Sequence, residues 1–188
     1  MSSPEYLMFE SQSRVKHEYV RGELFAMAGA TKAHNDVAGN VHSILRARLH
    51  GRPCRTYIAD VKLRVEPADV YFYPDVLVTC DPRDHADPLV VRHPVLVFEV
   101  LSDSTADYDR GEKFADYRRI ESLAEYVLVD SRAKRVEVFR REQHGWRFLP
   151  LAAGDTLTLA SIGLDVPVAA LYDDTDVPER QAHPSPAG

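Results

Sequence analysis

The segment that most constrains the fold is residues 94–101, PVLVFEVL, in which Glu99 is the one residue that is not apolar. A nearly continuous apolar run of this length is typical of a central β-strand whose two faces are both covered. A carboxylate in such a strand loses its hydration, and it stays charged only beside a cation or hydrogen-bond donors. The chain therefore has to supply a buried partner for Glu99.

The segment VYFYPDVLV (70–78) repeats this pattern, since Asp75 is its one charged residue. Asp75 follows Pro74, which suits the start of a strand or a bulge. We expect 70–79 and 94–101 to be neighbouring strands, so that the two carboxylates lie together. Mg²⁺ or Mn²⁺ binds one or two carboxylates together with water molecules. The sequence thus predicts a divalent metal site at Asp75 and Glu99.

A third charged residue, Lys113, falls on a predicted helix over residues 110–120. Phe114, Tyr117 and Ile120 recur there at steps of three, so they face the sheet and Lys113 lies on or beside the buried stripe. A buried lysine needs a carboxylate or an anionic substrate. One buried Glu–Lys pair can be purely structural, but three charged groups converging from two strands and a helix favour a functional site.

The remaining pattern predicts an α/β (α+β) fold with one mixed central sheet flanked by helices. Besides the segments above, it predicts helices at 4–10 and 31–50, a β-hairpin of 17–20 and 23–28, strands at 55–59, 61–66, 125–130, 134–140 and 146–151, and a closing segment at 166–172. Asp109 is expected to cap the 110–120 helix, with Glu112 reaching back in a capping box. We expect a single domain over residues 1–172 and a flexible C-terminal tail over 173–188.

Composition and charge narrow the function classes. At 188 residues and 45% hydrophobic content, the chain suits one domain with a substantial core. The net charge of −6 argues against a general nucleic-acid coating protein, which has to neutralise phosphates. Arginines and lysines gather at 46–64 and at 110–119, which is compatible with a local basic surface or with ordinary solvated faces.

Signals for export or membrane insertion are not recognisable. The N-terminal segment has no basic start followed by an apolar stretch, and the apolar runs are too short to cross a bilayer. Cys54 and Cys80 have no metal-ligand spacing. We therefore expect a soluble protein of the reducing cytoplasm, with neither a disulfide framework, a zinc finger nor a membrane partner.

These same motifs resemble a known family. The ordered run of PDVLV (74–78), VFEVLSDST (97–105), DRGEKFADYRRI (109–120) and EYVLVD (125–130) is similar to the Uma family, classed as restriction endonucleases within the PD-(D/E)XK nuclease superfamily. The opening EYVRGELFAMAGATKAHNDVAGNVHSIL (18–45) is similar as well, and the likeness spans roughly residues 5–172.

The resemblance implies a restriction-endonuclease-like sheet and a site of defined composition. Asp75 and Glu99 would bind the divalent metal, and the backbone carbonyl of Val100 would be a further ligand. The superfamily pattern places a lysine two residues after the second acid, where this chain has Leu101. In the Uma-type pattern the lysine comes from the following helix, which is where Lys113 stands.

Three further residues are accessory candidates. His34 lies on the inward side of the 31–50 helix, where it could touch a phosphate or a metal-bound water, or be a satisfied core histidine. Glu23 could bind a second metal, or be an exposed strand residue or a partner for Arg21. Ser102 follows the strand of Glu99, and it suits either a phosphate contact or a turn before the helix.

The leading functional interpretation is hydrolysis of DNA phosphodiester bonds at an Asp75–Glu99–Lys113 site with Mg²⁺ or Mn²⁺. The alternative is a non-cleaving nucleic-acid-binding or assembly protein that keeps the nuclease fold. DNA is the expected partner. A homodimer is expected because a small hydrolase acting on a duplex gains from two symmetric sites, and a specificity partner is compatible with the pattern.

Overall fold

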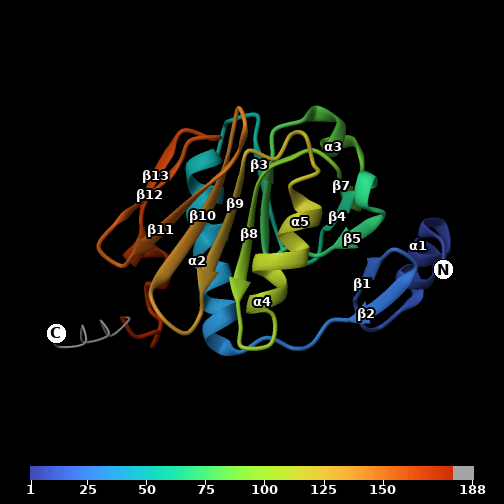
Figure 1. Cartoon of the computed structure of the whole chain (residues 1–188), viewed down its shortest axis with the longest axis horizontal. Helices are drawn as coiled ribbons and strands as arrows, with labels where there is room; N and C mark the ends of the chain where they lie inside the picture. Colours follow the sequence, from blue (N-terminus) through green and yellow to red (C-terminus); the bar gives the residue numbers. More distant parts are fainter. Residues whose placement is uncertain (180–188) are drawn as a thin grey trace.

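The main sheet has six strands in the order β11-β10-β9-β8-β6-β3. The structure, a computed structural model, describes residues 1–179. The strands are β3 (Arg55–Ile58), β6 (Val76–Thr79), β8 (Pro94–Leu101), β9 (Glu125–Asp130), β10 (Arg135–Glu142) and β11 (Gly145–Ala152). Strands β8 and β9 run parallel and the other neighbours antiparallel, so the sheet is mixed, as predicted. The strand that carries Glu99 lies inside the sheet (Figure 1).

The expectation of one central sheet is wrong, because a second sheet has five strands in the order β2-β1-β5-β4-β7. Its strands are β1 (His17–Val20), β2 (Glu23–Ala26), β4 (Lys62–Val65), β5 (Val70–Phe72) and β7 (Val90–Val91). The predicted strand 70–79 breaks around Pro74, so that β5 joins this sheet and β6 joins the main one. Asp75 therefore lies in the short connection between the two sheets.

The N-terminal hairpin of β1 and β2 is confirmed. Arg21 and Gly22 form its two-residue turn with φ of 49° and 98°, the positive values that a tight turn of this kind requires. Before the hairpin, α1 (Ser3–Gln12) covers the predicted helix 4–10. These N-terminal elements lie at one side of the molecule, where β1 pairs with β5 and the hairpin forms the edge of the five-stranded sheet (Figure 1).

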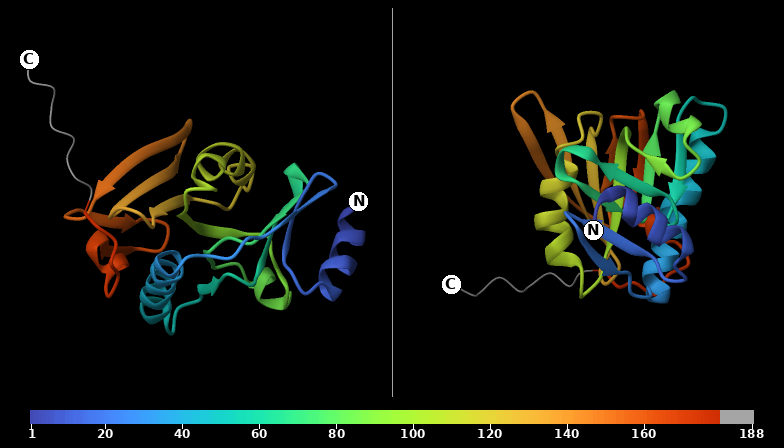
Figure 2. Two further views of the ribbon diagram at one scale, coloured as in Figure 1. Left: turned by 90° about the horizontal axis from the view of Figure 1, so that it is seen from below. Right: turned by 90° about the vertical axis from the view of Figure 1, so that its right-hand side faces the viewer.

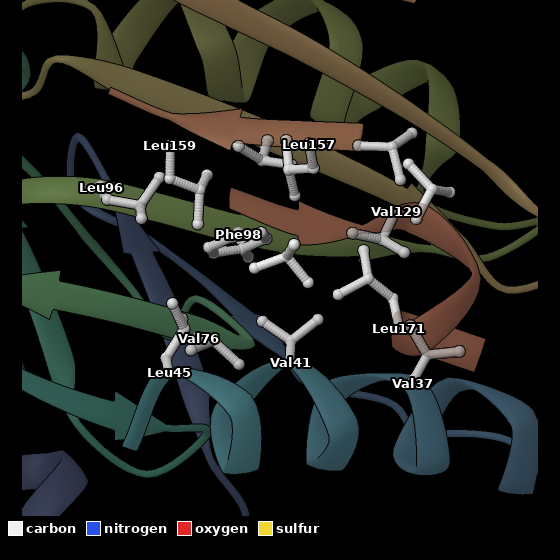
Figure 3. Packing of buried hydrophobic residues seen from close by; sticks show 14 of the residues in the cluster. Val37, Val41, Leu45, Val76, Leu96, Phe98, Val129, Leu157, Leu159 and Leu171 are labelled. Atoms are coloured by element: carbon white, nitrogen blue, oxygen red, sulfur yellow. The ribbon is translucent and has the colours of Figure 1, made fainter. Parts of the chain in front are cut away.

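The long helix α2 (Lys32–Leu49) covers one face of the main sheet and agrees with the predicted helix 31–50. The Thr31 side chain caps it by accepting a hydrogen bond from the backbone N–H of His34. The residues Val37, Val41 and Leu45 are buried against the sheet, as Figure 3 shows. This apolar layer holds α2, and with it His34, in a fixed place relative to β8.

The opposite face carries the helical segment that follows β8, seen across the sheet from α2 in Figure 2. It runs without interruption through α4 (Ala106–Tyr108), a π-helical turn η2 (Asp109–Lys113) and α5 (Phe114–Tyr117). It begins earlier than predicted, with Thr105 at the N-cap position, so the predicted capping box at Asp109 is wrong. Asp109 is instead a buried helical residue that faces Lys113.

The C-terminal part adds a two-stranded ribbon, β12 (Thr156–Leu159) and β13 (Leu164–Pro167), followed by the 3₁₀ turn η3 (Val168–Tyr172). The predicted closing segment 166–172 matches the end of β13 and η3, whereas β12 was not predicted. Within the predicted tail, Val177 is buried and the Pro178 carbonyl accepts a hydrogen bond from Lys134 N–H at 2.9 Å. Packed chain thus continues past residue 172, and residues 180–188 of the predicted tail lie outside the described residues.

Two cysteines form a bond that the sequence did not lead us to expect. The β3–β6 register pairs Arg55 with Thr79, which brings Cys54 opposite Cys80, and the two form a disulfide. The expectation of two reduced cysteines is therefore wrong, since their adjacency depends on a strand pairing rather than on spacing. The remaining short elements are α3 (Pro82–Ala86) and η1 (Glu66–Ala68). Among the described helices, none has the length and apolar character to cross a membrane.

Candidate active site

Glu99 occupies the polar position on one face of β8. Side chains alternate along a strand, so Leu96, Phe98 and Val100 join the core under α2, while Glu99 points to the opposite face with Val97 and Leu101. Glu99 is only 4% exposed there. A carboxylate at this depth needs partners, and the helical segment after β8 supplies them.

Lys113 is the main partner of Glu99. Its Nζ lies 2.9 Å from Glu99 Oε1, 3.1 Å from Glu18 Oε1 and 3.8 Å from Asp109 Oδ1. It also sits 5.3 Å from the centre of the Phe72 ring. The lysine is 6% exposed, so one ammonium group is buried among three carboxylates.

Hydrogen bonding and charge make the two ends of the Glu99 carboxylate unequal. Tyr117 donates its hydroxyl to Oε1 at 2.7 Å, the oxygen that Lys113 also contacts. Within residues 1–179, Oε2 makes no hydrogen bond. Burial raises the pKa of Glu99 well above its usual range; Lys113 opposes this, while Asp75, Asp109 and Glu18 add to it.

The charges around Lys113 act on the lysine in the opposite sense. Burial alone would lower the pKa of Lys113, but Glu99, Glu18 and Asp109 together raise it well above its usual range. The three carboxylates therefore favour the charged form of Lys113.

Asp75 lies where β6 begins, next to the end of β8. The register pairs Val76 with Phe98, so one further step places Asp75 opposite Glu99. Asp75 Oδ2 accepts a hydrogen bond from the Val100 N–H at 2.7 Å. The predicted pair of carboxylates is thus brought together from adjacent strands of the main sheet.

His34 reaches the same place from the first turn of α2. Its Nε2 lies 3.4 Å from Asp75 Oδ2. Burial by itself would lower the pKa of His34, but Asp75 and the Val100 backbone raise it overall. Of the two readings of His34, the geometry favours a residue of the candidate site, because its Nε2 lies beside the predicted acid Asp75.

The donor set suits a hard divalent cation. Asp75 and the free Oε2 of Glu99 are carboxylate oxygens, the ligand type that Mg²⁺ and Mn²⁺ prefer. Glu18 and Asp109 bring the number of nearby carboxylates to four, against one buried lysine. No three side chains of His, Cys, Asp or Glu within residues 1–179 form a ready metal cage. Mg²⁺ needs only one or two carboxylates besides water, so the residues fit it.

Two of the accessory candidates lie away from this network. Glu23 is exposed in β2 and makes no ion pair in the described chain, while Arg21 pairs with Asp116 at 2.6 Å. Ser102 contacts the hydroxyl groups of Ser104 and Thr105, as expected for a turn before a helix. The hairpin does contribute to the site, but through Glu18 rather than Glu23.

The sequence did not identify Glu18, Asp109 or Tyr117 as residues of the site. Asp109, Lys113 and Tyr117 stand at successive steps of four, a spacing that could have identified two of them as neighbours of the lysine. For Glu18 the sequence holds no such signal, because its place depends on how the second sheet packs against the helix.

Among the network residues, exposure is greatest beside Asp75. The Asp75 side chain is 21% exposed and that of His34 is 17%, whereas those of Glu99 and Lys113 are below 10%. A cavity of about 380 Å³ lies elsewhere, with Arg64, Arg92, His93 and Arg119 in its lining. The surface beside Asp75 is thus the part of the network that solvent reaches most.

Comparison with known proteins identifies the class. Residues 3–169 match the model of the Uma2 family, described as "Putative restriction endonuclease", and the chain belongs to this family. The uncharacterized protein slr1290 of Synechocystis sp. is 38% identical over 173 residues, covering 92% of this chain and 91% of the relative. A second Synechocystis protein, the uncharacterized sll1609, is 35% identical over 116 residues, which cover 61% of this chain and 66% of the relative.

A solved structure supports the fold. The chain is similar to the crystal structure of a protein from Anabaena variabilis ATCC 29413, described as a putative nuclease belonging to DUF820. The TM-score is 0.75 at 15% identity, with 91% of this chain and 97% of that chain covered. At this identity the likeness establishes the shared fold, and the roles of Asp75, Glu99 and Lys113 have to be argued from their own geometry.

Proposed function

We propose that the protein is a metal-dependent endonuclease that hydrolyses DNA phosphodiester bonds. The observation that carries the proposal is the contact of Glu99 with Lys113 in the core, beside Asp75 on the adjacent strand. A carboxylate in contact with a buried ammonium, next to a second carboxylate, combines oxygen donors for a cation with a positive charge, and both can assist phosphodiester hydrolysis.

Each residue has a defined task in this proposal. Asp75 and Glu99 Oε2 would hold one Mg²⁺ or Mn²⁺, and the Val100 carbonyl would be a further ligand. When bound, such an ion activates water and stabilises the charge that develops on a phosphoryl group. Lys113 donates N–H bonds from a fixed position, and it can polarise the nucleophile or stabilise the negative charge of the transition state.

His34 would orient Asp75. Its Nε2 lies 3.4 Å from the carboxylate, and its backbone lies in the first turn of α2, where the helix dipole is positive. Both features favour an anion at this end of the helix. We infer that His34 steadies Asp75 and faces the phosphate side of the site.

DNA is proposed as the substrate for two reasons. The family model is described as "Putative restriction endonuclease", and Asp75 and His34 are partly exposed at the surface, where a polymer can reach them. Self-association and a specificity partner belong to the same proposal, since a duplex offers two strands to two symmetric sites. The proposed location is the cytoplasm, where such a substrate is found.

The test combines cleavage and metal binding. Supercoiled plasmid and single-stranded DNA are incubated with Mg²⁺ or Mn²⁺ and either the wild type, Asp75→Ala, Lys113→Met or, as matched control, the exposed Glu23→Gln. We expect cleavage by the wild type and the control, and a loss of at least about 100-fold in Lys113→Met. Calorimetry should show that Asp75→Ala loses Mn²⁺ binding, because one carboxylate cannot hold a well-hydrated ion.

Two results would contradict the proposal. Equal Mn²⁺ affinity in the wild type and Asp75→Ala would reject the metal assignment. Binding of DNA without cleavage under every metal condition would favour the non-cleaving nucleic-acid-binding protein instead.

A further inference from the structure

A cavity of about 380 Å³ lies where the second sheet meets the chain that leaves α5. Its walls come from β4 and η1, from the residues just before β8, and from the turn after α5. The charged residues and the histidine of the lining are Arg64, Glu66, Arg92, His93, Arg119 and Glu121. Three guanidinium groups from distant parts of the chain thus line one cavity.

This cavity is separate from the candidate active site. His93 directly precedes β8, and Glu99 follows six residues later on the same strand. A strand rises about 3.3 Å per residue, so the two residues lie about 20 Å apart. The cavity therefore needs an explanation of its own.

Arg119 brings an uncompensated positive charge to the cavity. Within the described residues it forms no ion pair, and its Nη1 donates a hydrogen bond to the Pro67 carbonyl at 2.9 Å. A guanidinium group carries five N–H donors, so most of those of Arg119 remain for a ligand. The contact with Pro67 fixes the group in place without neutralising its charge.

Arg64 and Arg92 are each oriented by a carboxylate that lies outside the lining. Arg92 Nη1 is 2.7 Å from Asp87 Oδ2, and Arg64 Nη2 is 2.8 Å from Asp69 Oδ1. The guanidinium of Arg64 also lies 4.5 Å from the centre of the Tyr71 ring. Both arginines are therefore held in fixed positions while some of their N–H groups stay unused.

The two glutamates of the lining oppose these charges only weakly. The side chain of Glu66 is 70% exposed, and its Oε1 lies 3.6 Å from Arg92 Nε, while Glu121 is exposed as well. Water and salt screen exposed charges more strongly than buried ones, and the side chain of Arg64 is only 12% exposed. The lining therefore favours an anion.

His93 shows that the wall before β8 is held in place. Its Nδ1 lies 3.0 Å from Oδ1 of Asp84, whose side chain is 2% exposed. The same carboxylate accepts the backbone N–H groups of Arg92 and His93 at 2.9 and 3.0 Å. The segment that carries Arg92 is thus anchored to α3 before any ligand arrives, which lowers the entropy cost of binding.

We propose that this cavity binds a small phosphate monoester. Guanidinium groups match the oxygens of a phosphate with paired N–H donors, and several of them suit its two negative charges. Val65, Pro67 and Ile120 also line the cavity and offer apolar surface to an organic group. Its volume is at the lower end of the range of about 300–1,000 Å³ for ligand sites, which fits a small ligand. This inference does not depend on the proposed nuclease activity.

Calorimetry in metal-free buffer tests binding of thymidine 5′-monophosphate, inorganic phosphate and thymidine to the full-length protein and its variants. The wild type should bind the monophosphate more tightly than inorganic phosphate, and thymidine should not bind. Arg119→Gln should weaken binding of the monophosphate at least about 10-fold, because a hydrogen bond between charged groups is lost. Glu66→Gln should tighten it, because a negative charge leaves the lining.

The matched control is Arg118→Gln, which removes the same charge from the neighbouring, exposed residue outside the lining. Its affinity should equal that of the wild type. Methyl NMR locates the bound molecule: the signal of Ile120 in the lining should shift, and that of Ile162 in the other core cluster should not.

Several results would overturn the inference. These are equal affinity of the wild type and Arg119→Gln for the monophosphate, no binding of the monophosphate, and binding of thymidine or inorganic phosphate as tightly as the monophosphate. A shift at Ile162 without one at Ile120 would also overturn it. If Arg119→Gln does not fold, Arg92→Gln takes its place, with the same expected loss. DNA cleavage is measured separately, so none of these results bears on the proposed function.

Discussion

The two faces of β8 are equally buried and chemically opposite. Toward α2, the residues Leu96, Phe98 and Val100 are at most 1% exposed and meet aliphatic side chains, as Figure 3 shows for Leu96 and Phe98. Toward α5, the same strand presents Glu99, which is 4% exposed and meets Lys113 and other charged groups. One strand therefore contributes to an apolar core and to a charged network at the same time.

The two faces of β8 differ in whether their contribution to stability depends on bound ions. The apolar face gains free energy simply by leaving water, whatever ions are present. The charged face contributes free energy only while its charges are balanced. Three carboxylates contact one lysine there and Asp75 neighbours Glu99, so negative charge is in excess. Substitutions on the first face should thus act independently of Mg²⁺, and substitutions on the second should depend on it.

The largest effect is expected on the apolar face. Phe98→Ala leaves a cavity between α2 and the sheet and should lower the free energy of unfolding by about 4 kcal/mol. Urea unfolding with and without Mg²⁺ measures it, and the loss should be the same in both. The exposed Phe148→Ala is the control, with an expected loss below about 0.5 kcal/mol. A loss at Phe98 that Mg²⁺ repairs would contradict the comparison.

The charged face should respond differently. Without Mg²⁺, Lys113→Met leaves buried carboxylates uncompensated and should cost about 3 kcal/mol. With saturating Mg²⁺ most of this loss should disappear, because the bound cation balances the acids. Thermal unfolding of the variant in both conditions checks this. A cost that is unchanged by Mg²⁺ would mean that Lys113 acts as a structural ion-pair partner alone.

Local patterns predicted the elements of the fold better than their assembly. The strand at 94–101 and the helix at 31–50 follow from apolar periodicity within one segment, and both are confirmed. The strand expected at 70–79 divides between two sheets, because an apolar run does not say which sheet it joins. The helix expected from residue 110 begins four residues earlier, since Asp109 finds its partner in Lys113 rather than at a helix cap.

The same limit applies to the site: local sequence identified some of its residues but not those that depend on assembly of the sheets. Asp75 and Glu99 could be found because each is the one charge in an apolar segment, and Lys113 because it lies beside the apolar stripe of its helix; Lys113 contacts Glu99, and the register places Asp75 opposite Glu99. Glu18 stands in a short hairpin with Glu23, and local sequence does not tell which of the two glutamates contacts Lys113. That choice depends on the packing of the second sheet, which forms from segments distant in the chain.

A covalent link on the side of the apolar core offers a third test. The disulfide of Cys54 and Cys80 joins β3 to the end of β6, with a sequence separation of 26 residues. Its reduction should lower the free energy of unfolding by about 2 kcal/mol, because the unfolded chain regains freedom. Urea unfolding with and without reductant measures this, with Cys54→Ala/Cys80→Ala as the control that reductant should leave unchanged. An equal response of both proteins to reductant would show that the link contributes nothing.

The smallest effect concerns pH and a residue on α2 rather than on β8. Burial lowers the pKa of His42, Arg46 lowers it further, and the backbone of Thr56 partly opposes them. The folded protein therefore favours the neutral ring, and this contribution to stability is fully present above the ordinary histidine pKa of about 6.5. It is lost as the pH falls through the lower pKa of the folded state.

His42→Gln removes this titration without removing the polar character of the position. The melting temperature of the wild type minus that of His42→Gln should therefore fall between pH 7.5 and pH 5. The control is His144→Gln in the exposed β10–β11 turn: the melting temperature of the wild type minus that of His144→Gln should be the same at both pH values. Both variants lie far from the carboxylates in sequence and on other elements, so Mg²⁺ should not alter the result. A wild-type advantage that grows on acidification would mean that the charged form of His42 is the one the fold prefers.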